Sequence, residues 1–325
     1  MRNILIPEIG LRIPVLGFGC GALTGTSRKN ADHLLAAAFD AGIRHFDVAR
    51  YYGYGEAEGI LGAFLKTKRA QVTITSKFGI QPPRRSSALG IAVRAGRRIL
   101  RVLPSARKLV QTRTQGLVQG GAFSAADARN SLDTSLRELA TDHIDFYLLH
   151  EYVADGRPVD ELVAFLEGAV SAGKIGRFGI ATGIENVLAA LQSDPRLCGI
   201  VQFENNVLKE NAGKLPSGTA ARRLVITHGP VGHCYRVLSS FLSGHSDVAR
   251  EWTEKLGADV SQAATISGLL LNYAVAANPD GLVLFSSMKP ETVAKNAEAV
   301  FAPEFSAAQV TQFAELVRRD VTPVS

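Results

Sequence analysis

The chain has 325 residues, a mass of 34.7 kDa, a hydrophobic fraction of 46% and a formal net charge of +6. This length is long for an ordinary domain and matches one α/β barrel. No stretch approaches the roughly 20 apolar residues that a membrane span needs, and the first eight residues predict no signal peptide. Cys20, Cys198 and Cys234 form no CxxC pair, so we expect no structural disulfides and a cytoplasmic protein.

From residue 15 onward, short apolar runs alternate with helical patterns, which is typical of βα units and a parallel sheet. The predicted strands are 15–19, 44–47, 72–76, 144–149, 177–181, 200–203, 224–227 and 282–285. The predicted helices are 30–41, 56–66, 125–139, 159–172, 184–192, 261–276 and 290–300. Eight strands alternating with helices favour a closed (β/α)8 TIM barrel over an open sheet, with residues 1–325 as a single domain. The first fourteen residues, divided by Gly10, predict a β-hairpin that plugs the amino-terminal end of this barrel.

The positive charge is concentrated in one segment after the third predicted strand. Residues 82–122 contain nine arginines or lysines and no acidic residue. Subtracting these nine charges from the formal net charge of +6 leaves −3 for the rest of the chain. Three interpretations of this basic insertion stay open. It is a helical lid over the barrel mouth, an arm that contacts a membrane surface or nucleic acid, or a solvated insertion.

Four polar residues lie at or just after the ends of predicted strands: Asp47, Tyr52, Lys77 and His150. Because the carboxyl ends of barrel strands share one mouth, we expect these side chains to meet. Taken alone, each has a structural explanation, as a turn cap, a rim aromatic residue, a solvated strand end or a core histidine. Their joint placement favours an active site.

These residue types suit the reduction of a carbonyl group, because the alkoxide that hydride transfer creates needs a proton. A tyrosine with a pKa near ~10 is a weak acid at neutral pH unless a cation stabilises its phenolate. Lys77 supplies that cation and Asp47 holds it in place. His150 donates a hydrogen bond to the carbonyl oxygen or shares the proton transfer.

Residues 45–53 resemble the signature of the aldo-keto reductase superfamily, in which an Asp is followed five residues later by Tyr-Gly. Residues 75–77 and 145–150 are similar to the strand-end lysine and histidine of that family, and residues 172–180 to its Gly-Lys-Ile turn. The resemblance covers nearly the whole chain outside 82–122. It implies a (β/α)8 barrel and NAD(P)H-dependent reduction of an aldehyde or ketone, or oxidation of the corresponding alcohol or sugar.

The resemblance also assigns roles to residues. Tyr52 would be the general acid and base, Lys77 and Asp47 would tune it, and His150 would orient the carbonyl. The cofactor would be NADP or NAD, with neither favoured, because Ser286 and Thr292 stand where the family commonly places cations against the 2′-phosphate. The predicted cofactor-binding residues are Gly19, Cys20, Asp47, Thr182, Gln202, His228, Gly229, Pro230, Val231, Ser287 and Asn296.

Other classes fit less well. The glycines at 17, 19 and 21 do not form a GxGxxG fingerprint, and no HExxH motif supports a metal site around His228, so we expect no metal. The remaining alternative is a nicotinamide-binding regulatory or interaction module that docks through 82–122. The favoured partner is a small-molecule carbonyl or alcohol substrate, with no nucleic acid, no membrane span and a monomeric or weakly associated chain.

Overall fold

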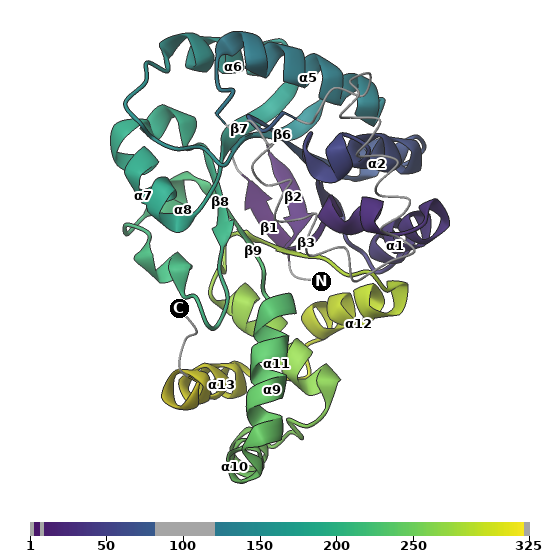
Figure 1. The fold of residues 1–325 in the computed structure, drawn as a ribbon, viewed down its shortest axis with the longest axis vertical. Coiled ribbons are helices and arrows are strands. Elements are labelled where there is room, and N and C mark those ends of the chain that lie inside the picture. Colours follow the sequence, from purple (N-terminus) through teal and green to yellow (C-terminus); the bar gives the residue numbers. More distant parts are fainter. Residues whose placement is uncertain (1–2, 7–9, 82–120, 322–325) are drawn as a thin grey trace, which may run out of the picture.

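The computed structural model describes residues 3–6, 10–81 and 121–321. Eight parallel strands close into a barrel in the order β10-β3-β4-β5-β6-β7-β8-β9 (Figure 1). The strands are β3 (Leu16–Gly19), β4 (His45–Asp47), β5 (Thr73–Phe78), β6 (Ile144–His150), β7 (Ile175–Ala181), β8 (Ile200–Glu204), β9 (Leu224–His228) and β10 (Leu282–Phe285). The predicted barrel is confirmed, and each predicted strand end lies within two residues of the observed one.

The helices lie outside the barrel. They are α1 (Arg28–Asp40), α2 (Ala57–Leu65), α5 (Ala125–Leu139), α6 (Asp160–Ser171), α7 (Ile184–Ser193), α8 (Thr219–Arg222), α9 (Gly232–Gly244), α10 (Ser246–Leu256), α11 (Ala263–Ala276), α12 (Pro290–Phe301) and α13 (Ala307–Asp320). The sequence analysis did not predict α8, α9, α10 or α13. For α13 a signal was available, because Ser306 and Gln309 form a capping box at its start.

A short antiparallel hairpin precedes the barrel. Strand β1 (Asn3–Ile6) pairs with β2 (Leu11–Pro14), with Ile4 opposite Ile13. Ile4, Ile6 and Ile13 are buried and belong to the same hydrophobic cluster as the barrel strands. Since β2 leads directly into β3, the hairpin lies at the amino-terminal end of the barrel, as predicted.

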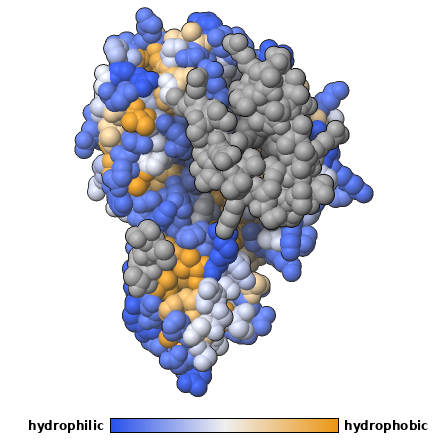
Figure 2. All heavy atoms as spheres, in the orientation of Figure 1, coloured by the Kyte–Doolittle hydropathy of each residue, from blue (hydrophilic) through white to orange (hydrophobic). Residues whose placement is uncertain are grey.

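A second hydrophobic cluster lies outside the barrel, among α9, α10, α11 and α13. Its centre is Trp252, whose ring meets Phe313 edge-on at 6.1 Å and whose Nε1 donates a hydrogen bond to Asp320 at 2.8 Å. Figure 1 shows these helices below the barrel, and Figure 2 shows an apolar area on this part of the surface. The chain between β9 and β10 therefore builds most of a helical lobe beside the barrel mouth, and α13 completes it after β10.

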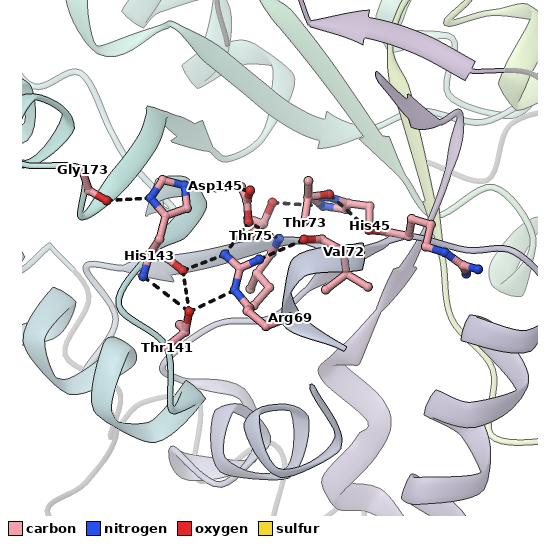
Figure 3. Close-up of polar contacts among 11 residues, drawn as sticks. His45, Arg69, Val72, Thr73, Thr75, Thr141, His143, Asp145 and Gly173 are labelled. Atoms are coloured by element: carbon pink, nitrogen blue, oxygen red, sulfur yellow. Dashed lines mark hydrogen bonds and ion pairs between the residues drawn. The ribbon is translucent and has the colours of Figure 1, made fainter. Parts of the chain in front are cut away.

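The amino-terminal end of β5 and β6 is tied together by one arginine (Figure 3). The guanidinium of Arg69 donates to the Asp145 carboxylate at 2.8 Å, to Thr141 Oγ1 at 3.0 Å and to the carbonyl oxygen of His143 at 2.7 Å. The same carboxylate accepts the backbone N–H of Ile74 at 2.9 Å. This network fixes the register of the two strands at the end of the barrel far from the mouth.

The lid, the arm and the insertion proposed for 82–122 lie almost entirely outside the described residues. Within the described ranges, no helix is both long and apolar enough to cross a bilayer.

Candidate active site at the barrel mouth

A cavity of about 560 Å³ opens at the carboxyl ends of the barrel strands. All four predicted catalytic residues line it: Asp47 at the end of β4, Lys77 on β5, His150 at the end of β6 and Tyr52 on the 3₁₀ turn after β4. They come from separate segments of the chain. The barrel therefore brings together the residues that the sequence analysis selected.

A chain of short polar contacts joins three of these residues. Lys77 Nζ lies 2.5 Å from Asp47 Oδ1 and 3.4 Å from Tyr52 Oη. The second carboxylate oxygen of Asp47 accepts a hydrogen bond from Gln202 Nε2 at 3.0 Å. Asp47 and Lys77 are nearly fully buried, with 3% and 2% of their surfaces exposed. The ion pair therefore belongs to the cavity wall but has almost no exposed surface, and the ammonium of Lys77 contacts the phenol of Tyr52 directly.

Burial and charge set the protonation of this group. Burial raises the pKa of the Tyr52 phenol, and the ammonium of Lys77 acts in the opposite direction. Burial alone would lower the pKa of Lys77, but the nearby Asp47 carboxylate and the Tyr52 hydroxyl outweigh it, so this pKa is raised. At neutral pH, Tyr52 keeps its proton and Lys77 keeps its charge.

The ring of His150 packs against the phenol ring of Tyr52. The two rings meet edge-on with centroids 5.8 Å apart. Burial, together with repulsion from Lys77 and His228, lowers the pKa of His150 to about 3. Among the described residues, none forms a hydrogen bond with its buried Nδ1. A neutral imidazole at this place is available to a ligand in the cavity.

Two glycines shape the surroundings of Tyr52. Gly53 has a φ of +60°, and a Cβ added there would lie 2.2 Å from the Thr24 side chain, so only glycine fits. A Cβ on Gly21 would lie 3.7 Å from the ring of Tyr52. A larger side chain at 21 would thus occupy the space beside the phenol, and glycine leaves that space open.

The predicted cofactor residues separate into two groups. Gly19, Asp47, Thr182, Gln202, His228, Gly229, Pro230 and Val231 line the cavity. Cys20, Ser287 and Asn296 are not part of its wall: Cys20 and Asn296 are buried, and Ser287 forms hydrogen bonds with Lys289 in the turn before α12. Among the described residues, no cluster of potential ligands fits a metal ion.

Several residues of this region were absent from the sequence prediction. Glu151 and Glu204 line the cavity, and Glu151 has a φ of +55° that is held by a 2.7 Å hydrogen bond from its N–H to Ala181 O. The available signal for both was their place in the sequence, because Glu151 directly follows His150 and Glu204 lies two residues after Gln202. Glu58 follows the family signature at residues 45–53, and its complete burial against Arg50 and Ser76 needed coordinates to be seen.

With this geometry in place, comparison with known proteins gives the class. The family model of the aldo/keto reductase family matches residues 15–216, and the chain belongs to this family. An aldo-keto reductase of Bacillus halodurans in its holo form superimposes with a TM-score of 0.73 at 22% identity, covering 97% of this chain and 96% of that one. An aldo-keto reductase of Klebsiella pneumoniae in complex with NADPH gives a TM-score of 0.68 at 21% identity, covering 100% and 97%.

Relatives by sequence match over shorter regions. A D-threo-aldose 1-dehydrogenase of a Pseudomonas species is 31% identical over 198 residues, which is 55% of this chain and 53% of that protein. A pyridoxal 4-dehydrogenase of Microbacterium luteolum is 45% identical over 74 residues, or 22% of each chain. The chain thus spans about half the length of the first of these relatives and about a fifth of the second.

Proposed function

We propose that this protein is an NAD(P)H-dependent oxidoreductase that reduces an aldehyde or ketone, or oxidises the corresponding alcohol, with Tyr52 as general acid and base. The observation that carries the proposal is the buried Asp47–Lys77 ion pair, with the Lys77 ammonium 3.4 Å from the hydroxyl of Tyr52. This arrangement stabilises a phenolate without exposing the cation to solvent. Membership of the aldo/keto reductase family supports the same reaction.

The cavity fits the amide end of a nicotinamide. Gln202 Oε1 is buried and has no hydrogen-bond partner among the described residues, although the same side chain is anchored to Asp47 through Nε2. An amide N–H of the nicotinamide would satisfy this acceptor. Thr182 and the flat ring of His228 lie in the same wall and would hold the rest of the ring. A bound nicotinamide would supply the hydride, or accept it in the reverse direction.

The residues of the chain provide the other half of the reaction. In reduction, the carbonyl oxygen lies between Tyr52 and His150, and the neutral imidazole donates a hydrogen bond that orients it. Tyr52 Oη gives its proton to this oxygen as the alkoxide forms. Lys77 stabilises the phenolate that remains, and Asp47 keeps Lys77 charged and in place. In oxidation, the same phenolate takes the proton from the alcohol.

Residues near the cavity and the similar proteins bear on the nucleotide and on the substrate class. The Klebsiella neighbour bound to NADPH supports NADP, whereas Ser286 and Thr292 lack the positive charge that would clamp a 2′-phosphate. The carboxylates of Glu151 and Glu204 in the wall favour a hydroxylated carbonyl compound. One relative is named for a D-threo-aldose, a polyhydroxylated aldehyde.

Titration with NADPH and NADH, followed by aldehyde-dependent cofactor oxidation, tests this function. Tyr52→Phe keeps the ring and removes the proton, so we expect unchanged nucleotide affinity and a fall in kcat of about 10²–10⁴. Failure of both nucleotides to bind would refute the cofactor site. Equal turnover by Tyr52→Phe and the unmodified protein would refute the role of Tyr52.

A further inference from the structure

A buried carboxylate outside the cavity links the two chain segments that carry Tyr52 and Lys77. Glu58, in the first turn of α2, has none of its surface exposed. Its Oε2 lies 2.9 Å from Arg50 Nη1, and its Oε1 accepts a hydrogen bond from Ser76 Oγ at 2.7 Å. Arg50 stands two residues before Tyr52, and Ser76 directly precedes Lys77. One oxygen of the Glu58 carboxylate thus binds a residue close to Tyr52 in the sequence, and the other oxygen binds the residue next to Lys77.

The helix that carries Glu58 is itself closely packed. One turn further along α2, a Cβ added to Gly62 would lie 2.6 Å from the backbone of Leu139 at the end of α5. This close approach leaves α2 little freedom to shift relative to the helix layer. Glu58 is therefore anchored on a rigid element, and the segments that it holds take their position from it.

The loop between β4 and Tyr52 is also joined to β5 by contacts to its backbone, including one of 3.4 Å from Lys77 Nζ to Val48 O. Val48 N donates to Thr75 O at 2.9 Å, and Arg50 N donates to Lys77 O at a longer 3.3 Å. The second of these bonds is the one nearest to Tyr52. The side-chain bond from Arg50 to Glu58 is shorter and charged, so it is the stronger restraint at this point.

We propose that Glu58 is a positioning residue, which sets the distance between Tyr52 and Lys77 by holding Arg50 and Ser76 at the same time. This inference rests on the proposed function, since it concerns the proton donor of that reaction. Glu58 does not touch the cavity, and its effect passes through Arg50 and Ser76. Loss of the clamp moves the Tyr52 hydroxyl away from the ammonium.

The direction in which the pKa of Tyr52 changes when Glu58 is replaced distinguishes a positioning role of Glu58 from a direct effect of its charge. Tyr52 is faced by Lys77 from β5, Asp47 from β4, Cys20 from the turn after β3 and the ring of His150 from β6. Lys77 is the group among them that lowers the pKa of Tyr52. If Glu58 acted on Tyr52 only through its negative charge, neutralising it would lower the pKa of Tyr52, because the carboxylate would no longer repel the phenolate. Releasing the clamp would raise it, because Tyr52 would lose the stabilising contact with Lys77.

The decisive variant is Glu58→Gln, which keeps the shape and one acceptor but removes the charge. Arg69→Met is the control, because it breaks a somewhat more exposed ion pair with Asp145 at the opposite end of β5 and β6. We expect Glu58→Gln to lower kcat at least tenfold with KM within twofold. Arg69→Met should lower the melting temperature by a similar amount and leave kcat and its pH profile unchanged. Glu58→Asp, which retains the charge, should recover part of kcat.

A measurement on the nucleotide-free protein separates this inference from the proposed function. Tyrosines replaced by 3-fluorotyrosine report ionisation by ¹⁹F NMR, and Tyr52→Phe assigns the signal. We expect the pKa at Tyr52 to be higher in Glu58→Gln than in the unmodified chain, and unchanged in Arg69→Met. A lower or equal pKa, or a Glu58→Gln variant that loses stability while keeping kcat, would overturn the inference. The pKa result stands even if no carbonyl substrate is turned over.

Discussion

Replacing Lys77 by Met tests the central electrostatic claim, because the two side chains have similar shape and differ in charge. The ammonium lies 3.4 Å from Tyr52 Oη. At an effective dielectric constant of about 20, a full charge at this distance stabilises a phenolate by ~5 kcal/mol. Asp47, 2.5 Å from the same ammonium, offsets part of this field. We therefore expect a loss of about 3 kcal/mol, typical of a strong hydrogen bond to a charged group.

This free energy corresponds to a fall in kcat of about 150-fold in the aldehyde direction. The assay is steady-state cofactor oxidation at saturating nucleotide and pH 7, with circular dichroism to confirm folding. Lys77→Met leaves Asp47 buried without its cation, so the double variant Lys77→Met/Asp47→Asn serves as control. The double variant should regain stability and stay slow. A folded single variant with kcat within tenfold of the unmodified protein would refute the reasoning.

Three further predictions follow from the described contacts. Gly53→Ala places a Cβ against the Thr24 side chain at a positive φ, so the free energy of unfolding should fall by at least ~2 kcal/mol, and an unchanged denaturant midpoint would contradict this. Burial lowers the pKa of His45 to about 4, below its unfolded value of about 6.5. The neutral ring therefore stabilises the fold above pH 6.5, and this stability is lost as the pH falls toward 4, by up to ~1.4 kcal/mol per unit. His45→Gln should flatten that part of the stability–pH curve, and an identical slope in both proteins would exclude His45 as the source. Glu151→Gln should reduce the preference in kcat/KM for glyceraldehyde over propanal by about tenfold, as expected for a lost charge-assisted hydrogen bond, and equal ratios would remove Glu151 from substrate recognition.

The sequence predicted the barrel well because its strands are short apolar runs bounded by polar residues and turns. In a closed parallel barrel such runs are buried on both faces, and all four residues of β10 are buried. Three of the four helices of the lobe, α9, α10 and α13, were missed for a physical reason. Helices α9 and α10 lie within the single βα unit between β9 and β10, and α13 follows the last strand and its helix, so counting strands and crossovers does not require them.

The meeting of Asp47, Lys77 and His150 around one cavity could be predicted because their position at strand ends follows from the chain itself. The contacts around them could not, since they depend on which neighbours approach from other segments. Gln202 supports Asp47 across 155 positions of sequence, and no local pattern encodes that pairing. The positive φ of Glu151 likewise depends on a hydrogen bond to Ala181 on the neighbouring strand.

Strand β5 shows how one short segment serves both chemistry and support. Its residues alternate between the two faces of the barrel wall. Thr73 and Thr75 hold the buried ring of His45 through contacts of 2.8 and 3.1 Å, and Lys77 continues the same inward row to the ion pair with Asp47. Ser76 points to the other face and meets Glu58. A one-residue shift in the register of this strand would move Lys77 into the helix layer and Ser76 into the barrel. The pairing of β5 with its neighbours is therefore a condition for the proposed catalysis as well as for folding.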